Sequence, residues 1–152
     1  MTTAPVSLSD NAMNIEQEIR VKASLDATFA TLLEQLGPGF ATPAGVSLQS
    51  KIEPWPGGRW FRDLGDNNGH FWANVQSIKR PTLLEFSGPL MMSLAVVNNV
   101  QYRLSEEGGV TLIKFHHYAF GAIPESFRTG MPEGWGLLLQ QIKVRAEAKD
   151  KH

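Results

Sequence analysis

The sequence contains no cysteine among its 152 residues, which excludes disulfides, thiol catalysis and thiolate metal sites. It also lacks a long apolar run, since the three leucines at 137–139 are far too few to cross a bilayer. The first residues, MTTAPVSLSDNAMN, have neither a basic nor an apolar segment of the kind found in secretion signals. A cytoplasmic protein without membrane insertion is therefore expected.

A strong charge of either sign is lacking as well. The formal net charge is −1, from 14 basic and 15 acidic residues that are interspersed along the chain. There is thus no electrostatic basis for binding nucleic acid or an anionic membrane. The length suits one domain with its own core. We predict that residues 1–13 form a flexible tail and residues 14–149 a single domain.

What the sequence does have is a clear change of hydrophobic period. Residues 15–23 alternate and predict a strand, and the helical spacing that follows predicts a helix over 25–36 with Ser24 as its N-cap. Gly37-Pro38-Gly39 ends that helix. Between 46 and 120 the period is two residues, and we predict strands at 47–53, 58–64, 70–78, 82–88, 94–105 and 110–119. Short connections rich in glycine, proline and asparagine favour an antiparallel meander.

The last element is predicted to be a helix. Pro124 opens a short turn, and Pro132 is expected in the first turn of the longer helix that follows. The apolar stripe of this helix comprises Trp135, Leu138, Leu139, Ile142 and Ala146. Only this helix is long enough to cover the concave face of a twisted sheet. Because a bent sheet and a straight helix do not pack flush, a gap is expected between them, filled by large side chains or by a ligand.

Several segments of this chain resemble the START-like superfamily, also called SRPBCC. They are IRVKASLDATF, PGGRW, VQSIKRPTLLEF, GVTLIKFHH and GWGLLLQQI, which occur in this order between residues 15 and 148. The resemblance implies an α+β helix-grip fold, in which a seven-stranded curved antiparallel sheet wraps around a long C-terminal helix, with one or two short helices after the first strand. Within the superfamily, the sequence is most similar to homologues of the heat-shock chaperone ATPase activator. It departs from the family pattern at Ser24, where proline is usual, and in lacking a tryptophan after the first helix.

The resemblance also implies a range of functions. Members of the superfamily bind hydrophobic small molecules or lipids, some cyclise or dehydrate polyketides, and no catalytic residue is common to all. We therefore expect a protein that binds a hydrophobic or aromatic small molecule, without a cofactor and without an assigned catalytic residue. One alternative is a polyketide cyclase or aromatase in which His117, Tyr102 and Arg62 converge on one cavity. Another is a chaperone-cofactor role, which the resemblance alone implies. The sequence leaves a homodimer open.

The expected cavity wall follows from alternation along the strands. Matching the last strand to the family pattern turns Thr111, Ile113, Phe115 and His117 inward. On the strand at 70–78, the set containing Phe71, Ala73 and Val75 is expected to face inward rather than the set containing Trp72. The candidate cavity-lining residues are Trp60, Arg62, Phe71, Val75, Phe86, Asn98, Tyr102, Phe115, His117, Trp135, Leu138, Leu139 and Ile142.

Among the polar candidates, His117 could orient a ligand carbonyl or act as an acid or base. The favoured interpretation is a histidine whose ring is satisfied by neighbouring groups. Arg62 could neutralise a carboxylate in the cavity, although a cross-strand ion pair with Glu85 is the more ordinary arrangement. No pattern such as His-Glu-x-x-His is present, so no metal site is predicted.

Overall fold

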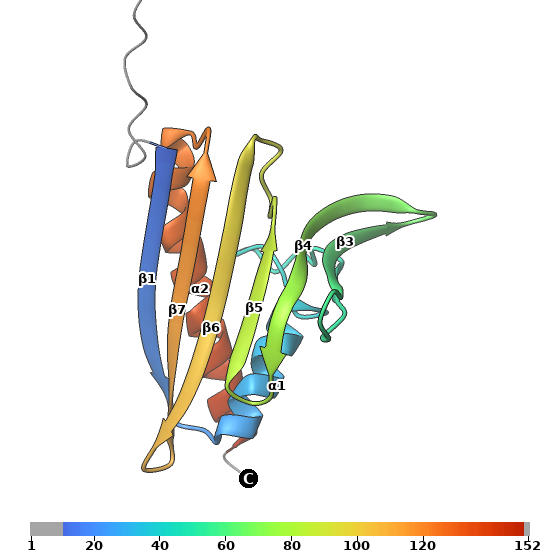
Figure 1. Ribbon diagram of the computed structural model, residues 1–152. Helices are drawn as coiled ribbons and strands as arrows, with labels where there is room; N and C mark the ends of the chain where they lie inside the picture. Colours follow the sequence, from blue (N-terminus) through green and yellow to red (C-terminus); the bar gives the residue numbers. More distant parts are fainter. Residues whose placement is uncertain (1–10, 151–152) are drawn as a thin grey trace, which may run out of the picture.

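The computed structural model describes residues 11–150 and consists of one seven-stranded sheet and two helices (Figure 1). The elements in chain order are β1 Ala12–Val21, α1 Leu25–Leu36, β2 Ser50–Ile52, β3 Arg59–Gly65, β4 Asn68–Lys79, β5 Leu83–Gly88, β6 Val96–Glu107, β7 Val110–Gly121 and α2 Glu125–Lys149. Every strand pair is antiparallel. The predicted α+β helix-grip fold is confirmed.

The strands lie in the order β1-β7-β6-β5-β4-β3-β2. From β2 to β7 each strand pairs with the next along the chain, which is the predicted meander. The first strand closes onto the last, with Ile15 opposite His117 and Ile19 opposite Ile113. In Figure 1, α2 crosses behind β1, β7 and β6, while the tips of β3 and β4 extend away from it. The sheet is thus covered by α2 at one side and reaches past it at the other.

The first two elements, β1 and α1, begin close to the positions predicted from the sequence. β1 begins at Ala12, so two residues of the predicted tail belong to the strand; residues 1–10 lie outside the described part of the chain. Ser24 is the N-cap of α1, as predicted, and its hydroxyl accepts a hydrogen bond from the backbone N–H of Ala27 at 3.1 Å. One helix follows β1. The loop 37–49 after it contains a single bridge between Ala41 and Ser47.

The final helix begins earlier than predicted. α2 runs without interruption from Glu125 to Lys149, with Pro132 inside it rather than in its first turn. Proline lacks the N–H for one helical hydrogen bond and normally weakens a helix at that point. Contacts with β1 compensate, because the Gln17 side chain donates to the Pro132 carbonyl at 2.7 Å and Arg128 donates to the Ala12 carbonyl at 2.8 Å. Tertiary contacts therefore overcome the local preference.

The inward face of β4 also differs from the prediction. Phe71 is 45% exposed, whereas Trp72 is buried together with Ala73 and Val75. The pairing with β3 jumps at this point, since Trp60 lies opposite Ala73 but Phe61 lies opposite Phe71. The extra residue forms a β-bulge, which turns Trp72 into the core and Phe71 out of it. The assignment of Phe71 to the inner face was therefore wrong.

The turn between β3 and β4 consists of Asp66 and Asn67, which have φ angles of 52° and 63°. Two successive residues in the left-handed region are typical of a type I′ hairpin turn, and aspartate and asparagine tolerate this conformation better than most residues.

Within the described chain, neither helix has the length and apolar character needed to span a bilayer.

Candidate functional site

The space between the sheet and α2 is largely occupied by aromatic side chains. A row of rings crosses it from β4 to α2, with successive centroids 4.9–6.3 Å apart. In order, the row comprises Trp72, Trp60, Phe86, Tyr102, Phe115 and Trp135. Aromatic pairs at such distances contribute packing energy beyond the area that they bury. The aromatic residues near the β3–β4 hairpin are thus split, because Trp60 and Trp72 build the core whereas Trp55 is 55% exposed.

His117 lies at the end of this row and both of its ring nitrogens are hydrogen-bonded. The indole N–H of Trp135 donates to His117 Nδ1 at 3.0 Å, so the proton of the neutral ring is on Nε2 and is donated to Asn98 Oδ1 at 2.7 Å. The Asn98 amide in turn donates to the Gly88 carbonyl at 3.1 Å. Burial, with a smaller contribution from His116, lowers the pKa of His117 to about 4. The ring is therefore neutral at pH 7 and satisfied by its neighbours.

Tyr102 is different, because its buried hydroxyl has no hydrogen-bond partner. Burial raises the pKa of Tyr102 far above its usual value, so the phenol stays protonated at all ordinary pH values. Arg62 also lacks a partner for its buried Nε. The ion pair expected between Arg62 and Glu85 is not formed; the Glu85 carboxylate instead accepts hydrogen bonds from Asn99 and Gln101.

An apolar groove of about 550 Å³ lies along α2, outside the aromatic row. We call it the α2 groove. Its walls come from the end of α1, the loop 37–49, the β5–β6 connection and one face of α2. The lining residues are Gln35, Gly39, Phe40, Ala41, Thr42, Pro43, Gly45, Leu48, Met91, Gly130, Met131, Gly134, Trp135, Leu137, Leu138, Gln141 and Arg145.

Two glycines of α2 form part of the floor of the α2 groove. Gly130 and Gly134 lie four residues apart and therefore on the same face of the helix. A Cβ atom added at either position would have no atom within 4 Å, so open space stands above both. Glycine costs about 1 kcal/mol relative to alanine inside a helix. The two glycines thus weaken the helix locally and widen the groove.

A buried amide faces the same groove. Gln35 is 3% exposed, and its side-chain nitrogen has no hydrogen-bond partner. Gly39 lies directly against it, because a Cβ at that position would be 2.7 Å from Gln35 Nε2. Any larger residue at 39 would have to displace the amide. An unpaired buried amide is costly unless a bound molecule supplies the missing partner.

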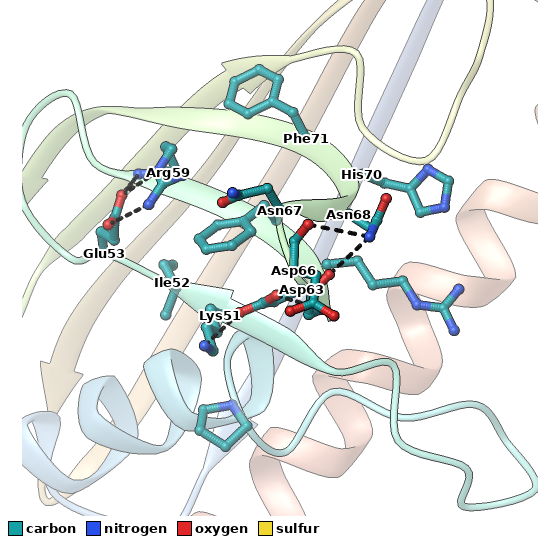
Figure 2. A pocket seen from close by; sticks show the side chains of 15 residues that line it. Lys51, Ile52, Glu53, Arg59, Asp63, Asp66, Asn67, Asn68, His70 and Phe71 are labelled. Carbon is teal, nitrogen blue, oxygen red and sulfur yellow. Dashed lines mark hydrogen bonds and ion pairs between the residues drawn. The ribbon is translucent and has the colours of Figure 1, made fainter.

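A second cavity, of about 870 Å³, lies beneath the extended β3–β4 hairpin (Figure 2). Its charged side chains are mostly paired with one another. Lys51 bonds to Asp63 at 2.6 Å, and Arg59 bonds to Glu53 at 2.8 Å while its guanidinium lies 4.4 Å from the ring centroid of Phe61. In the described chain no group of three or more His, Asp or Glu side chains could hold a metal ion. Apart from the unpartnered Nε of Arg62, this polar cavity shows no cluster of side chains that points to catalysis or metal binding.

A third cavity, of about 790 Å³, adjoins the α2 groove, with which it shares Leu48 and Met91. Arg62 and Phe71 line both this cavity and the hairpin cavity, and neither lines the α2 groove. Met91 is 43% exposed and stands between the two spaces. Methionine is flexible and adapts easily to different neighbours.

The residues predicted for the cavity wall fall into three groups. Trp135 and Leu138 line the α2 groove. Arg62 and Phe71 line the other two cavities. The remaining candidates lie inside the core and line none of these three spaces: Trp60, Val75, Phe86, Asn98, Tyr102, Phe115, His117, Leu139 and Ile142.

Gln35, Met91 and the glycines of α2 were not predicted as groove residues. One signal was present, since Gly130 and Gly134 interrupt an otherwise helical segment at a spacing of four. The position of Gln35 carried no such signal, because it depends on how α1 packs against α2.

The comparisons with known proteins agree with this architecture. The sequence matches no protein-family model and no curated protein. Among solved structures, CalU16 from Micromonospora echinospora is 21% identical, with 88% of this chain and 75% of that chain covered and a TM-score of 0.61. The di-domain ARO/CYC StfQ from the steffimycin biosynthetic pathway is 12% identical, with 93% and 53% covered and a TM-score of 0.67. Ara h 8.0201 is 13% identical, with 90% and 99% covered and a TM-score of 0.62.

These likenesses define the class of protein at the level of fold. The chain has a helix-grip fold, with a groove beside its C-terminal helix. At identities between 12% and 21% the likeness extends to the fold and no further. Similarity to the chaperone-activator branch stays a prediction from the sequence.

Proposed function

We propose that this protein binds a hydrophobic or aromatic small molecule in the α2 groove, without catalysing a reaction on it. The observation that carries the proposal is the groove itself, an apolar space of about 550 Å³ floored by two helical glycines and walled by Trp135, Leu138 and Phe40. Its volume falls within the range of small-molecule sites, which are mostly apolar with a few polar groups. START-like and SRPBCC proteins, which this chain resembles, bind ligands of the same kind.

The binding site differs from the one expected from sequence. The rings predicted to enclose a ligand pack against one another instead, and the groove lies between α2 and the loop 37–49. A ligand would contact the edge of the aromatic row at Trp135 rather than enter it. Binding therefore requires no opening of the core.

A thermal-shift panel of fatty acids, flavonoids and polycyclic aromatics, followed by native mass spectrometry, tests the proposal. A ligand at one hundred times its dissociation constant stabilises the folded state by about 2.7 kcal/mol, which for a chain of this size raises the Tm by about 5–10 °C. Gly134→Phe fills the groove and should abolish the shift. Gly134→Ala adds one methyl group at the same position and should retain it.

Two results would contradict the proposal. One is a panel in which no compound raises the Tm or appears in the native mass spectrum. The other is a shift that persists unchanged in a folded Gly134→Phe protein, which would mean that the ligand binds elsewhere.

The cyclase alternative has weaker support. It requires the polar atoms of His117, Tyr102 and Arg62 to meet in one cavity. His117 and Tyr102 are buried in the core, Arg62 lines cavities outside the α2 groove, and both nitrogens of His117 are already bonded. The likeness in fold to StfQ, an ARO/CYC, is the remaining argument for it.

An interaction role is favoured by a different surface. On the outer face of the sheet Val97 lies opposite Phe120, and the two are 68% and 45% exposed. Tyr118, also on this face, is 47% exposed. Exposed apolar clusters can mark protein contacts. A pull-down in which Val97→Lys/Phe120→Lys recovers the same proteins as the wild type would argue against this role.

A further inference from the structure

The α2 groove is long and has two chemically different ends. It follows α2 from Gly130 to Arg145, and fifteen residues at 1.5 Å per residue correspond to about 22 Å along the axis. The end near Gly130 is lined by Met131, and a second methionine, Met91 of the β5–β6 connection, also lines the groove. The other end carries Arg145 and two carboxamides.

The polar end comprises Gln35, Gln141 and Arg145, the first from α1 and the other two from α2. Gln35 is the informative member, because its buried nitrogen has no partner and the absent side chain of Gly39 leaves it room. All three side chains can donate hydrogen bonds, and Arg145 adds a positive charge. Such a set matches an oxygen acceptor, best of all a carboxylate.

No carboxylate of the described chain already occupies this role. The pKa of Glu34 is lowered first by its hydrogen bond to Lys149 and, more weakly, by the charge of Arg145. The Glu34 carboxylate is bonded to Lys149 at 2.5 Å. Arg145 forms no ion pair within 4 Å among residues 11–150.

We propose that the ligand of the α2 groove is an elongated amphipathic carboxylate, whose charged end lies among Gln35, Gln141 and Arg145 and whose apolar end lies against Met91 and Met131. This inference rests on the proposed binding function and adds to it the ligand's chemical class and direction. Gln35 supplies a hydrogen bond that the protein itself leaves unmade. Arg145 supplies the charge, and the methionines adapt to the apolar end.

The first experiment compares dodecanoate with 1-dodecanol, which has the same chain and no charge, by isothermal titration calorimetry at pH 7. We expect dodecanoate to bind about tenfold more tightly than the alcohol. Arg145→Gln should remove most of this preference by weakening dodecanoate alone. Arg103→Gln, which removes the same charge from the outer face of β6, should leave the preference unchanged. Gln35→Leu should weaken both probes, since each carries an oxygen that can accept from the amide.

The second experiment reads the direction of the bound chain. Dodecanoate with a nitroxide at its methyl end should broaden the methyl NMR signals of Met91 and Met131, assigned by single Met→Leu variants. The carboxylate should shift the side-chain NH₂ signals of Gln35, identified by their loss in Gln35→Leu. Both readouts require only a folded protein.

The outcomes separate the two proposals. If both probes bind equally and Arg145→Gln changes neither, or if the nitroxide spares both methionines, the carboxylate and its direction are wrong while the binding function stands. If neither probe binds the wild-type protein, and no compound of the thermal-shift panel does either, both proposals are overturned. Binding that a folded Gly134→Phe protein retains also contradicts both, because the ligand then lies outside the groove.

Discussion

Two buried polar side chains, His117 in the core and Gln35 at the α2 groove, differ in how their hydrogen-bonding groups are satisfied. Both ring nitrogens of His117 are bonded within the core, one to the Trp135 indole and the other to Asn98, which in turn donates to the Gly88 carbonyl. Gln35 is equally inaccessible, yet its side-chain nitrogen has no partner. The protein itself therefore satisfies the hydrogen-bonding groups of His117, whereas the Gln35 nitrogen is left for a partner from outside. This difference favours the α2 groove, rather than the histidine, as the functional site.

The aromatic row and the hydrogen bonds of His117 at its end should accordingly tolerate little change. The largest effect is expected from Trp60→Ala, because Trp60 is fully buried in the aromatic row and its indole N–H bonds to Leu36 and Ser50 at 2.7 and 3.0 Å. We expect a loss of about 4 kcal/mol in the free energy of unfolding, measured in urea. Trp55→Ala, at an exposed position, should change it by less than about 0.5 kcal/mol. Equal losses for both would show that the row is not the core.

His117→Leu should destabilise the protein by about 3 kcal/mol in the same measurement. The substitution leaves the Trp135 N–H and the Asn98 carbonyl oxygen buried without partners, and each such group costs about 1–3 kcal/mol. His70→Leu, on the exposed part of β4, serves as the control and should be nearly neutral. If His117→Leu left the free energy of unfolding unchanged, the hydrogen bonds of His117 to Trp135 and Asn98 would contribute nothing to stability.

The burial of a neutral His117 also predicts that the free energy of unfolding depends on pH. The pKa of His117 is about 4 in the folded state and near 6.5 when unfolded, so the unfolded state binds more protons between these values. The contribution of the neutral His117 to stability is therefore fully present above pH 6.5 and is lost as the pH falls toward 4. From pH 7 to pH 5 the loss should be about 2 kcal/mol.

His117→Gln can bond to the same neighbours but cannot titrate, so it should flatten this pH dependence over the same range. Burial also lowers the pKa of His116, and His116→Gln measures its separate contribution. A wild-type protein whose unfolding free energy is constant from pH 7 to pH 5 would rule out a neutral, buried His117.

Gln35→Leu gives the smallest effect and the opposite sign. Because the Gln35 nitrogen is unpaired in the free protein, an apolar side chain of similar size should raise the free energy of unfolding by about 1 kcal/mol. Glu34→Gln on the exposed side of α1, which removes the ion pair with Lys149, should lower it slightly instead. A clear loss of stability in Gln35→Leu would mean that the amide has a structural role, and the comparison with His117 would fail.

Much of the architecture could be predicted because it depends on local periodicity. The helix at 25–36 and its serine cap were predicted to the residue, and all five residues of the α2 stripe are buried. The inward set of β7, from Thr111 to His117, was expected from the resemblance to the family pattern and is buried, as a strand without a bulge alternates strictly.

The errors have a common origin in contacts between distant segments. The bulge in β4 moved Phe71 outward, which the sequence of that strand alone does not reveal. The extension of α2 before Pro132 depends on Gln17 and Arg128 bonding across more than one hundred residues of sequence. Local preferences of this size, about 3 kcal/mol for a helical proline, are readily exceeded by tertiary contacts.

By itself, the sequence determined which segments are strands and helices and, outside β4, which of their faces are apolar, because these properties follow from side-chain spacing over a few residues. It also determined that the aromatic side chains would gather beneath the last helix. Only the tertiary structure decided that those rings fill their space, and that the open groove lies instead between α2 and the loop 37–49. A cavity is what remains after packing, so its place depends on the fit of all its neighbours at once and is not encoded in any one segment.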